Sequence, residues 1–126
     1  MNNELVSVII ASYNHGPYIE KAITSVLDQS YPNVELFVVD DGSTDDSVNR
    51  IEKLLESRKF DFRAQKNKGL TRTLNETVAR SQGAYFAPFG SDDLMYPDRL
   101  AVQMAYVADK PEVGICGGNI ELIHAD

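Results

Sequence analysis

The sequence has little of three things that would place it quickly in a class of protein. It contains one cysteine, Cys116, it has no tryptophan, and no hydrophobic run approaches the ~20 residues of a membrane-spanning helix. A single cysteine cannot form a disulfide within the chain, which fits a reducing compartment. We therefore expect no membrane span and a cytoplasmic location.

Positive charge is also scarce. The chain carries 12 Lys and Arg against 19 Asp and Glu, a formal net charge of -7. Nucleic-acid binding requires a basic face, so nucleic acid is not an expected partner, and adsorption to anionic membranes is disfavoured. The segment 1–4 lacks the basic start of a signal peptide. Neither a Gly-x-Gly-x-x-Gly nor a Gly-Lys-Ser/Thr loop is present, which argues against dinucleotide oxidoreductases and P-loop enzymes.

What the chain does have is a regular alternation of two hydrophobic patterns. Its 126 residues predict one domain, 1–126. Strands are predicted at 5–11, 34–39, 60–64 and 84–89, with a last extended stretch at 113–123. The order β-α-β-α-β-α-β-α-β predicts an α/β fold, with a mostly parallel, doubly wound sheet and helices on both faces.

Helical stripes occupy the segments between these strands. Pro17 and Pro97 each suit the first turn of a helix, and Ser43 or Thr44 can cap another. For the helix that starts near residue 70, the predicted buried stripe is formed by Leu70, Leu74, Val78 and Ala79.

Two acidic pairs follow predicted strands. Asp40-Asp41 ends the second strand, which should be central, and Asp92-Asp93 follows the fourth. Since parallel strands open at one edge of the sheet, both pairs should meet there, where α/β proteins bind ligands. Asp and Ser are also common after strands because they form turns, but two converging pairs repel unless a cation or a hydrogen-bonding ligand offsets the charge.

Other polar side chains fall near this edge. Tyr13 can stack on a flat base or pack on the next helix, whereas the lone His15 reads as a polar loop residue. Lys66, Lys68 and Arg72 can contact a diphosphate or form an ordinary solvated face. Both interpretations of these residues stay open on the sequence alone.

Four segments together resemble the family 2 glycosyltransferases of the GT-A fold. They are Val6–Asn14, Val38–Asp45, Asn67–Leu70 and Ser91–Asp93, the last followed by Pro97-Asp98-Arg99-Leu100. The resemblance spans nearly the whole chain. It implies an enzyme that transfers a sugar from a nucleotide-diphosphate donor, with UDP the expected nucleotide, to a saccharide or lipid-linked hydroxyl acceptor with inversion.

The resemblance also implies roles for individual residues on the nucleotide side. Tyr13 would flank the base, and Ala11 and Ser12 would line the base pocket. Asp41 would hydrogen-bond the base, and Asp40 would support the turn.

On the diphosphate side, Asn67 and Lys68 lie in a segment that contacts the diphosphate or sugar in the family. Asp92 would lie near the ribose, and Asp93, with Asp92, would bind Mn²⁺ or Mg²⁺. Such an ion takes one or two carboxylates plus diphosphate oxygens, and it neutralises the leaving group.

The sequence departs from the family pattern in two places. Many members carry an Asp where this chain has Gly90, and an Arg where it has Leu74. An inverting transferase also needs a general base, which in the family lies well downstream of the metal pair. No catalytic base is expected within this chain; we expect it downstream of Asp126.

The chain is therefore predicted to be a donor-binding half, truncated before the acceptor-binding half. The surface left without that half would favour self-association, and a longer parent could lie peripherally at a membrane. Two alternatives remain: a nucleotide-sugar-binding module without catalysis, and a receiver-like signalling domain, which would need a phospho-accepting Asp on another strand end.

Overall fold

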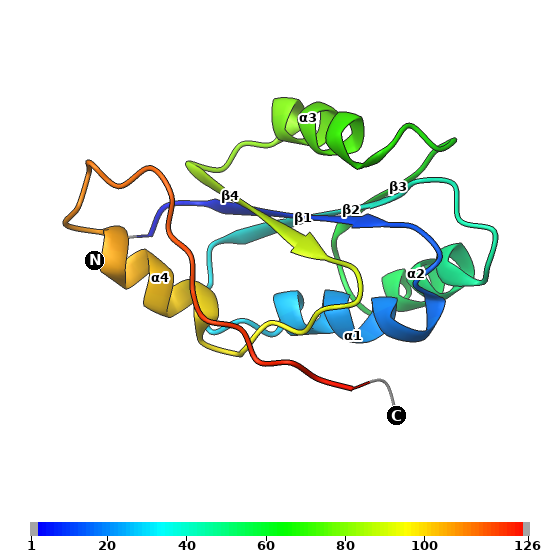
Figure 1. Cartoon of the computed structure of the whole chain (residues 1–126), viewed down its shortest axis with the longest axis horizontal. Helices are drawn as coiled ribbons and strands as arrows, with labels where there is room; N and C mark the ends of the chain where they lie inside the picture. The colour runs from blue at the N-terminus through cyan, green and yellow to red at the C-terminus, as the bar shows by residue number, and fades with distance from the viewer. Residues whose placement is uncertain (1–2, 125–126) are drawn as a thin grey trace.

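A computed structural model describes residues 3–124. Four strands alternate with four helices along the chain (Figure 1). They are β1 (Val6–Ser12), α1 (Gly16–Leu27), β2 (Val34–Asp40), α2 (Ser47–Leu55), β3 (Asp61–Ala64), α3 (Leu70–Arg80), β4 (Tyr85–Gly90) and α4 (Arg99–Val107).

The four strands form one parallel sheet in the order β3-β2-β1-β4. The prediction of a parallel α/β sheet is confirmed, and β2 is an inner strand as expected. In register, Ser12 lies opposite Asp40, Asp40 opposite Ala64, and Ala11 opposite Gly90. All four strands therefore end at one edge of the sheet, and the loops that follow them share that edge.

The main core lies between the sheet and helices α1, α2 and α4. Alternate residues of β1 point to this face, namely Val6, Val8 and Ile10. They pack with apolar side chains of the helices, including Ile19, Ile23, Ile51, Leu100 and Met104. A fully buried Val or Ile side chain contributes about 1.5–3 kcal/mol, so this face supplies most of the driving force for folding.

Helix α3 covers the opposite face of the sheet (Figure 1). The predicted apolar stripe of this helix is wrong in detail, because the side chains buried against the sheet are Thr73 and Thr77, whereas Leu70 is 62% exposed. The Thr73 hydroxyl donates to the carbonyl of Gly69, and Thr77 donates to the carbonyl of Thr73. Each threonine thus satisfies its hydroxyl within its own helix and can present its methyl group to the sheet.

The predicted fifth strand does not form among the described residues. After α4 the chain continues as coil through 124, drawn orange to red in Figure 1. Ile115, Ile120 and Leu122 are each more than 80% exposed, although Val113 and Cys116 pack against the core. A strand needs a hydrogen-bonded neighbour, and none of residues 113–124 pairs with β4 in the described part of the chain.

Two helices begin later than predicted. Pro17 lies in the first turn of α1, as expected. However, α2 begins at Ser47 and α4 at Arg99, rather than near Ser43 and Pro97. The reason for α2 is that the Ser43 hydroxyl already donates to Asp40 Oδ1 and accepts the N–H of Asn14, so it is used in the turn rather than as a helix cap.

Candidate functional site

The loop that follows β2 is a tight turn built on Asp40. This side chain is 1% exposed. Its Oδ2 accepts the backbone N–H of Ser43 at 2.8 Å, and its Oδ1 accepts the Ser43 hydroxyl at 2.6 Å. The Asp40 carboxylate therefore closes the turn from inside the protein, and both of its oxygens are occupied.

The neighbouring Asp41 reaches in the other direction, toward the loop after β3. Its Oδ1 accepts from Gln65 Nε2 at 3.0 Å and from the backbone N–H of Lys68 at 2.8 Å. Its Oδ2 accepts the backbone N–H of Gly69 at 3.0 Å. Three donors thus converge on one carboxylate that is 5% exposed.

These contacts also set the charge state of Asp41. Its burial acts to raise the pKa, but the hydrogen bonds from Gln65, Lys68 and Gly69 outweigh burial, and the pKa of Asp41 lies below its ordinary value of 3.8. The group is therefore an anion at neutral pH, and it is an acceptor for an N–H donor.

Gly42 allows the two loops to approach this closely. Its φ is +85°, and a Cβ there would stand 2.9 Å from the backbone nitrogen of Asn67. The Asn67 side chain in turn donates to the carbonyl of Asp41 at 3.0 Å. Asn67 and Lys68 are thus brought against the Asp41 turn, but by backbone and amide contacts rather than by the lysine charge.

The lysine charge is used elsewhere. Lys68 Nζ lies 3.0 Å from one carboxylate oxygen of Glu76, and Arg72 Nε lies 3.0 Å from the other. These exposed ion pairs hold the pKa of Glu76 below its ordinary value, through Lys68 first and then Arg72. Lys68 and Arg72 are therefore near the site, and both already form ion pairs with the single carboxylate of Glu76.

At the end of β1, Ala11, Ser12 and Tyr13 lie where the sequence placed them, at the carboxyl edge. Tyr13 is 49% exposed. Ser12 is fully buried, and its hydroxyl has no hydrogen-bond partner among the described residues. The exposed tyrosine ring is available to a flat ligand at this edge.

The second acidic loop follows β4 in a turn closed by the backbone N–H of Asp93 and the carbonyl of Gly90, 3.2 Å apart. Asp92 and Asp93 are exposed. Their carboxylates fold back over Gly90: a Cβ at that position would stand 2.3 Å from Asp93 Oδ2 and 3.3 Å from Asp92 Oδ1. The missing side chain of Gly90 therefore provides the space in which both carboxylates converge.

That convergence fits a divalent cation held by two carboxylates. Within residues 3–124 no group of three or more His, Cys, Asp or Glu side chains is arranged to hold a metal. Mg²⁺ binds through one or two carboxylates while it keeps waters or substrate phosphates, so a two-carboxylate site suits a metal that arrives with a diphosphate.

Sequence reasoning missed two residues that join these loops. Asn14 Oδ1 accepts the backbone N–H groups of Thr44 and Asp45, at 2.8 and 3.2 Å. His15 Nδ1 is hydrogen-bonded to the hydroxyl of Ser91 at 2.5 Å. One signal for Asn14 was available, since its φ of 52° is a conformation that asparagine tolerates better than most residues. The contact between His15 and Ser91 carries no sequence signal.

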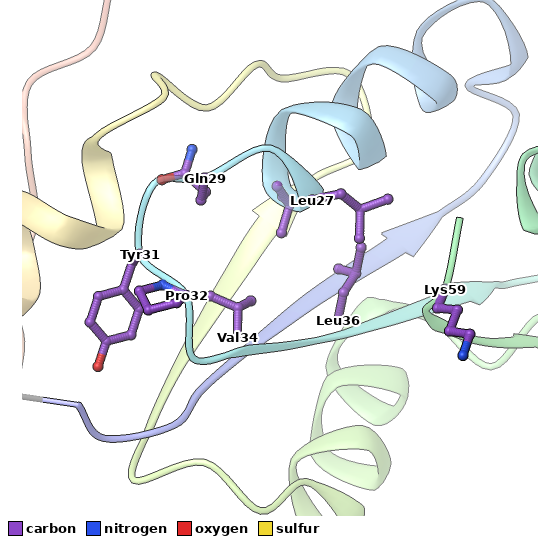
Figure 2. A pocket seen from close by; sticks show the side chains of 8 residues that line it. Leu27, Gln29, Tyr31, Pro32, Val34, Leu36 and Lys59 are labelled. Carbon is purple, nitrogen blue, oxygen red and sulfur yellow. The ribbon is translucent and has the colours of Figure 1, made fainter. Parts of the chain in front are cut away.

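A cavity lies away from the acidic loops, at the opposite end of β2. It has a volume of about 220 Å³, and Figure 2 shows it between the end of α1, the chain that follows and the start of β2. It is lined by Val26, Leu27, Gln29, Tyr31, Pro32, Val34, Leu36 and Lys59. No carboxylate is among these residues, so the candidate chemistry remains at the other edge.

The sequence pattern that defines glycosyl transferase family 2 matches residues 7–121. The chain belongs to this family. The receiver-like alternative is therefore set aside.

A curated family 2 relative illustrates the match. A putative teichuronic acid biosynthesis glycosyltransferase of Bacillus subtilis, TuaG, is 39% identical over 109 residues. The alignment takes in 84% of this chain and 43% of TuaG. The chain thus spans less than half the length of that glycosyltransferase.

Solved structures agree with the GT-A fold. The mannosyltransferase PcManGT from Pyrobaculum calidifontis, in complex with GDP-Man and Mn²⁺, superposes with a TM-score of 0.78 at 26% identity. It covers 87% of this chain, which corresponds to 34% of PcManGT. S. aureus TarS 1-349 in complex with UDP gives a TM-score of 0.74 at 27% identity, over 83% of this chain and 32% of that protein.

Proposed function

We propose that this chain is the donor-binding part of a metal-dependent, inverting glycosyltransferase. In this proposal the full-length protein transfers a sugar from a nucleotide-diphosphate donor, UDP-linked, to a saccharide or lipid-linked hydroxyl. The observation that carries the proposal is the convergence, in a family 2 chain, of the Asp40-Asp41 turn, Tyr13 and the Asp92-Asp93 loop at one sheet edge.

The nucleoside would bind between Tyr13 and the Asp41 turn. The Tyr13 ring is exposed at the edge and can stack on a base, and Ala11 and the buried Ser12 would lie beneath the base. In this proposal Asp41 accepts the N–H of a uracil ring, because its carboxylate is ionised and lies at this edge of the sheet. A second anionic ligand group at this turn would be repelled, so the base rather than the diphosphate belongs here.

The diphosphate would lie toward Asp92-Asp93. These carboxylates converge over Gly90 and would hold Mn²⁺ or Mg²⁺, with Asp93 as the principal ligand and Asp92 shared with the ribose. When bound, the ion neutralises charge on the departing diphosphate. In this proposal Asn67 and Lys68, which lie beside the Asp41 turn, contact the diphosphate or the sugar of the donor.

Transfer needs an acceptor hydroxyl and a general base to take its proton. We assign neither to residues of this chain; the base is expected downstream of Asp126, in an acceptor-binding half. Among residues 3–124 no helix is long and apolar enough to cross a bilayer. We propose a cytoplasmic site of action on a different ground, the single cysteine of the chain.

Exposed apolar side chains on and near β4 and α4 support this division into halves. Tyr96, Val102 and Tyr106 are each more than half exposed, and Phe86, also more than half exposed, lies on the face of β4 that points away from the main core. In the described part of the chain, β4 is also an edge strand with one side unpaired. Such a surface would be covered by further polypeptide, and on its own it favours self-association.

Calorimetric titration of the chain with UDP tests the proposal, first in Mn²⁺ and then in EDTA. We expect saturable binding that is strengthened by Mn²⁺, and GDP and ADP serve as controls for the base. If none of the three nucleotides binds, with or without Mn²⁺, the donor site is refuted.

A product assay on a longer parent separates transfer from binding alone. A parent that binds UDP-sugar in Mn²⁺ but forms no glycoside with any saccharide or lipid-linked acceptor would support a binding module instead.

A further inference from the structure

Two consecutive residues between β1 and α1 each hold one of the two acidic loops. Asn14 contacts the turn after β2, at positions 30 and 31 residues further along the chain. His15 contacts the loop after β4, 76 residues further along. Because the two residues are adjacent, the spacing between the acidic loops is set by one short backbone segment.

Asn14 is held to its loop by four contacts to backbone or hydroxyl groups. Its Oδ1 accepts the N–H groups of Thr44 and Asp45 and, at 3.4 Å, the Thr44 hydroxyl, and its own N–H donates to Ser43 Oγ at 2.9 Å. Two residues further along, the N–H of Gly16 donates to Asp45 Oδ2 at 2.9 Å. The turn that contains Asp40 and Asp41 is therefore held by hydrogen bonds from the segment 14–16 as well as by the hydrogen bonds between Asp40 and Ser43 within the turn.

His15 is fastened to the residue directly before the metal pair. Ser91 is 4% exposed, and its hydroxyl is the atom that meets His15 Nδ1 at 2.5 Å. On the far side of the pair, the N–H of Met95 donates to Ser25 Oγ in α1, at 3.0 Å. Asp92 and Asp93 thus lie between two anchors, and both anchors belong to α1 or to the residue that precedes it.

We propose that His15 is a positioning residue for the Asp92-Asp93 carboxylates and that Asn14 is a positioning residue for the Asp41 turn. This inference rests on the proposed function. The hydrogen bond to Ser91 holds the second loop so that the two carboxylates converge over Gly90 before a ligand arrives. Such pre-organisation lowers the entropy that binding must offset.

The two anchors predict separable effects. Loss of the His15 contact should weaken the hold on the metal and leave the nucleoside end intact. Loss of the Asn14 contact should do the reverse. A purely structural role for either residue would instead lower stability and weaken both binding events together.

The test uses four single variants of this chain, one double variant and two probes. His15→Ala and Ser91→Ala each remove the contact to the metal loop, and His15→Asn retains a polar atom near the position of Nδ1. Asn14→Gly removes the contacts that the Asn14 side chain makes to Thr44 and Asp45, keeps the backbone N–H bond to Ser43, and tolerates the positive φ. The probes are Mn²⁺ binding to the UDP-saturated chain, followed by electron paramagnetic resonance, and UDP binding in EDTA, followed by NMR.

We expect His15→Ala and Ser91→Ala each to weaken Mn²⁺ binding by about five- to tenfold, which is the change in affinity expected from the loss of one hydrogen bond. Metal-free UDP affinity should stay within about twofold of wild type. The double variant, with His15→Ala and Ser91→Ala together, should lose little more Mn²⁺ affinity than either single variant, because both substitutions remove the same contact. His15→Asn should recover most of the loss, and Asn14→Gly should weaken metal-free UDP binding more than Mn²⁺ binding.

Amide hydrogen exchange gives a readout that needs no ligand. Exchange at residues 90–95 should quicken in His15→Ala and Ser91→Ala, with the core strands unchanged. If wild type binds UDP and Mn²⁺ but both variants keep wild-type Mn²⁺ affinity, or lose both affinities equally, the inference alone is overturned. If wild type binds no nucleotide in Mn²⁺, the proposed function is overturned and this inference falls with it.

Discussion

The Oδ2 atom of Asp41 accepts the backbone N–H of Gly69 at 3.0 Å, so the turn after β2 is joined to the residue that caps α3. The two residues are 28 positions apart in the sequence. A negative charge at the amino end of a helix is also favourable, because the helix dipole is positive there. The Asp41 carboxylate therefore holds the loop after β3 in place and is favourably oriented toward the start of α3.

Replacement of Asp41 should destabilise the fold as well as the site. Asp41→Ala leaves two backbone N–H groups and the Gln65 amide without their acceptor, and we expect the free energy of unfolding to fall by about 2 kcal/mol. Urea unfolding followed by circular dichroism measures the change. Asp109→Ala is the control, since its exposed carboxylate forms a surface ion pair with Lys110, and it should change stability by less than ~0.5 kcal/mol. Equal stability of the two variants would contradict this account of Asp41.

The same carboxylate should make stability depend on pH in acid. Its folded pKa lies below the ordinary value of 3.8, so the unfolded chain takes up the proton first as the pH falls. The contribution of Asp41 is therefore complete above the ordinary value, and it is lost between that value and the lower folded pKa. Unfolding of wild type and Asp41→Asn, compared from pH 6 to pH 2, should show the difference in stability narrowing over that acid window. A difference that stays constant with pH would show that the pKa of Asp41 is not lowered.

Asp93 is the residue on which the metal assignment depends most. Asp93→Ala should abolish the Mn²⁺-dependent part of UDP binding and leave the metal-free part within about twofold, because the base contacts are elsewhere. Titration of UDP in Mn²⁺ and in EDTA measures both parts. Asp98→Ala is a matched control, since Asp98 is an exposed aspartate nearby with no side-chain cap hydrogen bond to α4. Unchanged Mn²⁺ dependence in Asp93→Ala would remove this residue from the metal site.

Gly90 should matter for the metal and little for the fold. A Cβ at this position meets Asp93 Oδ2 at 2.3 Å, and that oxygen is the end of a flexible, exposed side chain that can move away. Gly90→Ala should therefore weaken Mn²⁺ binding severalfold while the unfolding midpoint stays near that of wild type. Gly114→Ala is the control, because nothing lies within 4 Å of a Cβ there. Wild-type Mn²⁺ affinity in Gly90→Ala would show that the carboxylates do not need the space over Gly90.

The strands and helices were predicted from the local spacing of apolar and turn-forming residues, and most of these elements are confirmed. The run from Val6 to Ile10 and the acidic turn that follows Val39 could be recognised because strand burial and turn formation depend on residues close in sequence. The fifth strand was wrong because a strand also needs a neighbour, which periodicity cannot supply. The stripe of α3 was wrong because Thr73 and Thr77 satisfy their hydroxyls within the helix and can face the sheet.

The sequence by itself determined the α/β alternation, the parallel sheet and the position of both acidic pairs at its carboxyl edge, since all three follow from the spacing of apolar residues and turns. Only the tertiary structure decided what each acidic residue contacts. Asp41 is engaged by the N–H groups of Lys68 and Gly69, and the Asp92-Asp93 loop is tied to His15 through Ser91. These contacts join residues 27 to 76 positions apart, and the packing of the sheet, which brings the ends of all its strands to one edge, is what creates them.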